Sequence, residues 1–267
     1  MSLNVCVIQP FTLFWNKDEN LKQIQSIIQH SSNDIDLFVL PETFNTGFQP
    51  KAHLVAEDHS SSPTLQWMKT IARTRKCAIT GSITIKDGER IYNRMYFVYP
   101  SEECVWYDKH HLYHMGGEGL EFSNGSKKCI VNYKGWNILL AVCYDLRFPV
   151  WLRNTLENHY DILIIVGCWS VLNRAHWKIL TKARAIENQC FVLAANNCGS
   201  LPNCLPNDED SHYIGESAII DPYGKYIIKG KCGVQDSLNA TLTKKSQEAL
   251  TSTFPVLKDG DSFILQN

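Results

Sequence analysis

WNILLAVCYDLRFP, residues 136–149, is the stretch around which the rest of the chain is organised. The apolar residues 138–142 predict a buried strand, and Pro149 predicts a short helix near residues 149–156. Cys143 lies where the strand gives way to a turn, so its thiol borders the core and is reachable from one side. This placement suits a nucleophile. A buried cysteine is more often a small core hydrophobe, so position alone assigns no role.

Composition limits the classes of function that need to be considered. The chain has 267 residues, 44% of them hydrophobic, and we interpret residues 1–267 as one domain with a sizeable core. A formal net charge of −1 gives no electrostatic reason to expect a nucleic-acid partner. No apolar run approaches the roughly 18 residues needed to cross a membrane, and MSLNVCVIQP lacks a signal-peptide pattern. We therefore expect a cytoplasmic protein without a membrane partner.

Cysteine spacing favours reduced thiols over disulfides or a zinc ribbon. The chain has ten cysteines and no C-x-x-C pair. Six of them lie in or at the end of apolar, strand-like runs, which is typical of core thiols in a cytosolic protein. These six are Cys6, Cys77, Cys129, Cys143, Cys168 and Cys190.

Hydrophobic periodicity predicts an α/β protein with two sheets. Helices are predicted over 17–30, 63–75 and 174–189. Ten to twelve strands are predicted, at 3–9, 36–40, 77–85, 90–100, 103–109, 129–133, 137–142, 161–169, 190–196, 215–220, 226–229 and 237–242. This number exceeds what one open sheet usually carries, so we expect two mixed sheets packed face to face with helices outside. Residues 110–126 form a loop long enough to suggest function, and 198–212 predict a mobile surface loop.

Three apolar strands each end near an ionisable residue: Glu42, Lys109 and Cys143. Ligands tend to bind at strand C-termini on α/β scaffolds. A free cysteine titrates near ~8.5, so a nucleophilic thiol needs a base or a nearby cation. Glu42 can take the thiol proton, and Lys109 can stabilise an oxyanion together with the backbone N–H after the nucleophile. The three side chains therefore predict acyl transfer through a cysteine.

Several motifs resemble those of the nitrilase superfamily of carbon–nitrogen hydrolases. LPETF (40–44), YDKHHL (107–112) and VCYDLRFP (142–149) occur in that order, and the similarity extends over nearly the whole chain. ARAIENQ (183–189), the YDKHHL-x-HM-x-x-E loop and FPVLKDGDSF (254–263) resemble the bacterial ω-amidase branch. The resemblance implies a four-layer αββα sandwich, a homodimer, and no metal or organic cofactor.

The resemblance also implies roles for the candidate residues. Glu42 would be the general base, Lys109 the oxyanion stabiliser and Cys143 the acyl-forming nucleophile. A second glutamate is expected after the lysine; Glu118 matches the branch, and Glu121 is the competitor. This second glutamate would orient the lysine and the substrate amide.

An ω-amidase acts on the amide of a small α-keto acid, whose far carboxylate requires a cation. Arg147 and Arg174 are the candidates, because arginine binds carboxylates in a fork. An ion pair with Asp145 is the alternative for Arg147. Tyr144 and Phe44 are expected to line the acyl pocket.

Two positions depart from the ω-amidase branch. Asn173 stands where the branch has an arginine four residues after a tryptophan, here Trp169. Asn197 stands where the branch has the arginine of an Asn-Arg-x-Gly motif. Both departures bear on which substrate the chain uses, and neither bears on its catalytic class.

Other functions stay open at this point. The chain could be another amidase of the superfamily, acting on deaminated glutathione or an N-carbamoyl compound. It could be a papain-like or glutaminase-like Cys–His enzyme, or a catalytically silent binding module. A zinc site at His110, His111 and His114 is the weaker alternative. Metal sites need a third ligand at close spacing, and these residues do not evidently supply one.

Overall fold

Two mixed β-sheets form the centre of the computed structural model, which describes residues 1–202 and 207–265. The first sheet has the strand order β15 (Asp236–Thr243), β1 (Ser2–Gln9), β2 (Leu37–Val39), β4 (Ala78–Asp87), β5 (Arg90–Val98), β6 (Cys104–Asp108), with β3 (Glu57–Asp58) beside β4. The second has the order β14 (Tyr226–Lys229), β13 (Ala218–Ile220), β10 (Phe191–Asn196), β9 (Ile162–Gly167), β8 (Trp136–Val142), β7 (Ile130–Tyr133). The hairpin β11 (Cys198–Ser200) and β12 (His212–Ile214) stands apart from both.

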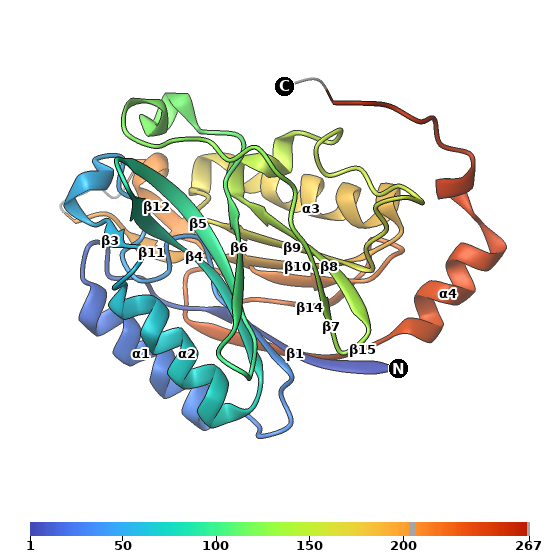
Figure 1. The fold of residues 1–267 in the computed structure, drawn as a ribbon, viewed down its shortest axis with the longest axis horizontal. Helices are drawn as coiled ribbons and strands as arrows, with labels where there is room; N and C mark the ends of the chain where they lie inside the picture. The colour runs from blue at the N-terminus through green and yellow to red at the C-terminus, as the bar shows by residue number, and fades with distance from the viewer. Residues whose placement is uncertain (203–206, 266–267) are drawn as a thin grey trace.

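Helices cover the outer faces of the two sheets, as the sequence predicted. Figure 1 shows α1 (Lys17–His30) and α2 (Pro63–Arg75) together on one side, and α3 (Arg174–Asn188) on the other. Both helices on the first side begin with a side-chain cap, Asn16 for α1 and Ser62 for α2. The four-layer α/β sandwich is therefore confirmed.

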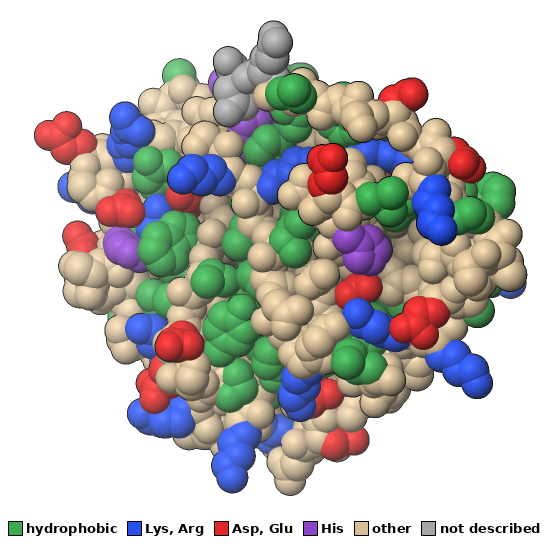
Figure 2. All heavy atoms as spheres, turned by 45° about the vertical axis from the view of Figure 1, so that its right-hand side comes forward, with side chains coloured by type: hydrophobic (Ala, Val, Ile, Leu, Met, Phe, Trp, Pro, Cys, Tyr) green, Lys and Arg blue, Asp and Glu red, His purple; other side chains and the backbone are tan. Residues whose placement is uncertain are grey.

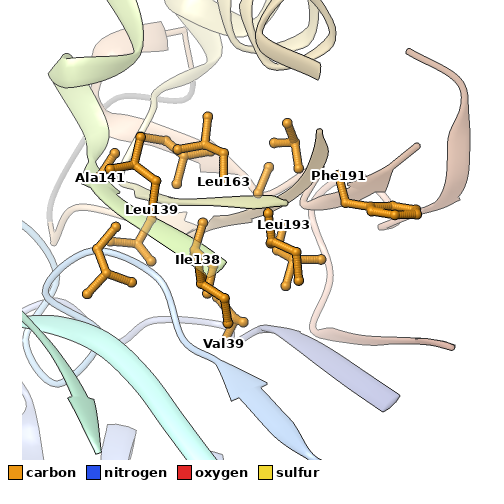
Figure 3. Packing of buried hydrophobic residues seen from close by; sticks show 14 of the residues in the cluster. Val39, Ile138, Leu139, Ala141, Leu163, Phe191 and Leu193 are labelled. Atoms are coloured by element: carbon orange, nitrogen blue, oxygen red, sulfur yellow. The ribbon is translucent and has the colours of Figure 1, made fainter. Parts of the chain in front are cut away.

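The sheets pack through alternate side chains of their inner strands. Along β1, Leu3, Val5 and Val7 belong to the core between the sheets, whereas Cys6 and Ile8 belong to the core beneath α1 and α2. This alternation follows from the two-residue period of a strand, and burial of both faces makes the strand almost continuously apolar. Figure 3 shows Val39 of the first sheet near Ile138 and Leu193 of the second.

The helix predicted near residues 149–156 is wrong. The chain instead forms a 3₁₀ turn over Cys143–Arg147, and residues 149–156 contain no α-helix. The backbone N–H of Asn154 donates to Asn188 Oδ1 at 2.9 Å, so it does not bind the carbonyl of Val150 as it would in a helix. The side-chain acceptor satisfies this N–H without a helix.

One helix, one hairpin and the short strand β3 were not predicted. The helix α4 (Lys244–Thr253) is mostly polar and buries only Gln247 and Leu250. Figure 1 shows it in red, beside the sheets rather than over them. Within the predicted loop at 198–212, β11 and β12 pair, while residues 203–206 lie outside the described residues.

The surface charges agree with a net charge near zero, and the cysteines agree with the expectation of reduced thiols. Figure 2 shows positive and negative side chains interspersed over the face that it presents. Nine cysteines lie among the described residues, all of them free thiols, and Cys204 lies outside. No helix in residues 1–202 and 207–265 is long and apolar enough to cross a membrane.

Candidate active site

Cys143 occupies a sharp turn at the end of β8. Its φ is 47°, in the left-handed region that residues with a side chain rarely adopt. Asp145 holds the turn, because its Oδ2 accepts the backbone N–H of Val142 at 3.1 Å and the Tyr107 hydroxyl at 2.7 Å. Arg184 of α3 donates to the carbonyl of Leu146 at 2.6 Å. A strained conformation over-determined by its surroundings is typical of a functional site.

Lys109 bridges two carboxylates beside this turn. Its Nζ lies 3.0 Å from Glu42 Oε1 and 2.8 Å from Glu118 Oε1. The exposed fraction of each of the three side chains is at most 1%. Glu42 follows β2, Lys109 follows β6 and Cys143 follows β8, so the strand ends bring together the groups that the sequence singled out.

The charges in this cluster set the protonation of the thiol. Burial raises the pKa of Cys143 well above its ordinary value, the charge of Glu42 adds to the rise, and Lys109 opposes it. Burial alone would lower the pKa of Lys109, but the charges of Glu118 and Glu42 outweigh it and raise that pKa. The resting site therefore holds a thiol beside a charged lysine, and attack by the sulfur requires a base.

Burial and neighbouring charges also shift the pKa of Glu42, the residue that the sequence suggested as the base. Burial raises its pKa, the charge of Lys109 opposes the rise, and the charge of Glu118 adds to it. Hydrogen bonding to the Cys143 thiol and to Lys109 also lowers this pKa. A base with a raised pKa takes a proton more readily at neutral pH.

The geometry separates the two candidates for the second glutamate. Glu118 is fully buried, and its Oε2 accepts the backbone N–H of Tyr113 at 2.5 Å. Glu121 points elsewhere and binds His53, with Nδ1 2.8 Å from the carboxylate. Of these two candidates, Glu118 is the one that contacts Lys109.

A cavity of about 630 Å³ opens onto this cluster. Glu42, Lys109 and Cys143 line its floor together with Cys168. The remaining lining side chains are mostly apolar or aromatic, with a few polar and charged groups: Trp15, Phe48, Pro50, Leu54, Tyr113, Met115, Tyr144, Trp169, Leu201 and Tyr213, with Gln49, Lys51, Arg147, Ser170, Asn173 and Asp210. An apolar cleft with a few convergent polar groups is typical of small-molecule sites.

The two candidate arginines have different surroundings. Arg147 lines the cavity, with its guanidinium 4.7 Å from the Trp169 ring and 2.9 Å from Asn173 Oδ1. Arg174 does not line it and instead forms a two-pronged ion pair with Glu216 at 2.8 and 2.9 Å. The alternative pairing of Arg147 with Asp145 is wrong, because that carboxylate binds Tyr107, His111 and the backbone of Val142.

The two side chains expected to line the acyl pocket lie in different parts of the structure. Tyr144 lines the cavity. Phe44 does not, because it is fully buried in the core beneath α1 and α2, with its ring 6.0 Å from that of Trp67. The structure therefore places Phe44 among packing residues.

The two departures from the ω-amidase branch have structural roles. Asn173 accepts a hydrogen bond from Arg147, as described above. Asn197 is fully buried and donates to the backbone carbonyl of Glu42 at 2.7 Å, while its Oδ1 accepts the Thr12 hydroxyl at 2.6 Å. Asn197 thus holds the loop that carries Glu42.

His110 and His111 of the 110–126 loop have partners other than a metal. His110 stacks on Trp151 at 3.8 Å between ring centres, and His111 stacks on Phe148 at 3.6 Å. His111 also places Nδ1 2.8 Å from Asp145 Oδ1. Within the described ranges, no group of three His, Cys, Asp or Glu side chains is arranged to hold a metal ion.

One buried residue of the cluster was not predicted from the sequence. Asn93 of β5 donates from Nδ2 to Glu42 Oε1 at 2.7 Å, and the same nitrogen lies 3.5 Å from Glu118 Oε1. Strand alternation could have identified it, because Asn93 shares a face with Met95, which packs between the sheets.

Comparisons with known proteins match the chain to one family. A family model described as carbon–nitrogen hydrolase matches residues 4–244. A Yersinia enterocolitica protein named omega-amidase YafV is 33% identical over 265 residues, which is 99% of each chain. A Bacillus subtilis protein named 2-oxoglutaramate amidase is 30% identical, over 97% of this chain and 98% of its own.

Solved structures give the same result. A CN-hydrolase superfamily protein from Xanthomonas campestris, whose structure has an arsenic adduct in the active site, covers 100% of both chains. It has a TM-score of 0.93 and 34% identity. The whole chain thus has a close structural counterpart.

Proposed function

The chain belongs to the carbon–nitrogen hydrolase family, and we propose that it hydrolyses the side-chain amide of a small α-keto acid amide such as α-ketoglutaramate. The products are the dicarboxylate keto acid and ammonia. The reaction passes through a thioester on Cys143. The relatives named omega-amidase and 2-oxoglutaramate amidase support this choice of substrate.

The first half of the proposed reaction acylates the enzyme. Glu42 takes the thiol proton of Cys143, and the sulfur attacks the amide carbon. The resulting oxyanion is stabilised by Lys109 Nζ and the backbone N–H of Tyr144. As the C–N bond breaks, the proton on Glu42 passes to the nitrogen, and ammonia leaves.

The second half releases the acid. Glu42 takes a proton from a water molecule, which attacks the thioester carbonyl. The same two donors stabilise the second oxyanion. When the C–S bond breaks, Cys143 regains the proton from Glu42, and the enzyme returns to its starting state. Glu118 keeps Lys109 oriented throughout.

One observation carries this proposal: the Lys109 ammonium, buried between two carboxylates, beside a cysteine at φ 47° on the cavity floor. A buried charge is costly unless it is paired. Here the pairing also pre-organises a cation beside the atom at which negative charge would develop.

Arg147 is the residue that we propose binds the substrate carboxylate. It lines the same cavity as Cys143, and aromatic rings and Asn173 hold its guanidinium. The size of the cavity favours a second candidate, because pockets of roughly 300–1,000 Å³ hold drug-sized ligands, which are larger than a five-carbon acid. That candidate is a superfamily amidase acting on deaminated glutathione or an N-carbamoyl compound.

Ammonia release from α-ketoglutaramate, α-ketosuccinamate, deaminated glutathione and an N-carbamoyl amino acid tests both candidates. We expect the keto acid amides to be hydrolysed fastest. Arg147→Ala should lower their kcat/KM by about 10- to 100-fold, mainly through KM, because a charged hydrogen bond to the carboxylate is lost.

Arg174→Ala is the matched control. It removes an arginine of the same region whose side chain is 46% exposed and paired with Glu216, outside the cavity. Its kcat/KM should match that of the wild type. Equal losses in both variants would contradict the role of Arg147, and fastest release from a larger amide would transfer the proposal to the second candidate.

A further inference from the structure

Asn93 sits at the centre of the carboxylate cluster without lining the cavity. It lies on β5, opposite Thr84 of β4, and its exposed fraction is 1%. Its backbone carbonyl accepts the N–H of Lys109 at 3.0 Å. One residue therefore contacts the lysine through its main chain and both glutamates through its side chain.

The orientation of the Asn93 amide follows from its partners. Ionised carboxylates only accept hydrogen bonds, so the NH₂ group, not the oxygen, must face Glu42 and Glu118. Among the described residues, Asn93 Oδ1 has no hydrogen-bond partner. The contacts of this side chain are thus made by its donor end.

The cluster needs such a donor because its formal charges do not balance. Two ionised carboxylates face one ammonium, and all three side chains are buried. The amide N–H groups supply partial positive charge between the two carboxylates, close to the Oε1 atoms that also contact Lys109. Oε1 of Glu42 is thus held by two donors, Lys109 Nζ and Asn93 Nδ2.

We propose that Asn93 is a positioning residue that fixes which carboxylate oxygen of Glu42 faces the Cys143 thiol and keeps that carboxylate ionised. This inference rests on the proposed function, because it takes Glu42 as the base. Asn93 acts through Glu42 and touches no substrate.

Alkylation of Cys143 by iodoacetamide, followed across pH by peptide mass spectrometry, tests the inference without any substrate. The test variant is Asn93→Leu, which is similar in size and has no donor. Loss of a hydrogen bond to the ionised form makes Glu42 harder to ionise. We expect the pH at which Cys143 becomes reactive to rise by about one unit or more.

Asn154→Leu is the matched control. Asn154 is also a buried amide, with hydrogen bonds of 2.9 and 3.0 Å to the carbonyls of Tyr160 and Asn188. Its loss should lower stability and leave the alkylation profile of Cys143 unchanged. If Asn93→Leu does not fold, Asn93→Ser is measured in the same way.

The outcomes separate this inference from the proposed function. A raised profile in a folded Asn93 variant, with none in Asn154→Leu, supports the inference. A wild-type profile in a folded Asn93 variant, or an equal rise in the control, overturns it. A wild-type enzyme that hydrolyses no amide would overturn the proposed function and leave the alkylation result intact.

Discussion

Lys109→Met is expected to reduce kcat by roughly 10²- to 10³-fold, the typical cost of removing one oxyanion donor. The variant should also lose about 3–5 kcal/mol of unfolding free energy, because Glu42 and Glu118 are left as buried carboxylates without their cation. Ammonia release and denaturant unfolding measure the two effects.

The stability loss in Lys109→Met should depend on pH in a defined direction. Without the lysine, burial and the charge of Glu118 raise the pKa of Glu42 unopposed, so the folded state holds a proton on Glu42 more tightly than the unfolded chain does. Stability therefore falls as pH rises and partly recovers as pH falls. Lys128→Met is the control, since this lysine lies 5.5 Å from the Trp151 ring, away from the cluster. Equal activity in both variants would contradict the role of Lys109.

Glu42→Gln is expected to lower kcat/KM by roughly 10²- to 10⁴-fold, the usual contribution of a general base. In the wild type, burial raises the pKa of Glu42 and the charge of Glu118 adds to it, while Lys109 opposes. The charged form is the active one, so activity should fall as pH drops through a value above that of an ordinary carboxylate. This acidic limb should disappear from the residual activity of the variant.

Glu121→Gln provides the comparison, because Glu121 pairs with His53 outside the cluster. It should retain wild-type activity and the wild-type pH profile. If Glu42→Gln kept most of its activity and His111→Ala lost it, a Cys–His mechanism would replace the one proposed here.

Much of the fold could be predicted because helix caps and the spacing of apolar residues indicate the same elements. The caps Asn16 and Ser62 precede periodic apolar positions, and both helices begin where these residues predict. α4 was missed because it is largely polar and buries only two side chains, so its pattern resembles that of a loop. The helix expected after Pro149 does not form, and the backbone N–H of Asn154 binds Asn188 Oδ1 of α3 instead of a helical carbonyl.

The cluster was predictable to the extent that its residues stand at strand ends. Glu42, Lys109 and Cys143 each follow a strand: β2 and β6 end at the same edge of the first sheet, and β8 belongs to the second sheet. The direction of a side chain was harder to predict: Phe44 packs into the core, although it lies two residues after Glu42. The Arg174 side chain does not line the cavity because it pairs with the buried Glu216. No local sequence pattern reveals this partner.

The most direct test of the account is the covalent state of Cys143 during turnover. Wild-type enzyme mixed rapidly with α-ketoglutaramate, quenched in acid and analysed by intact-mass and peptide mass spectrometry should carry an acyl group on Cys143. Cys143→Ala should carry none and release no ammonia. An acyl group on another residue, or full ammonia release by Cys143→Ala, would contradict the central claim.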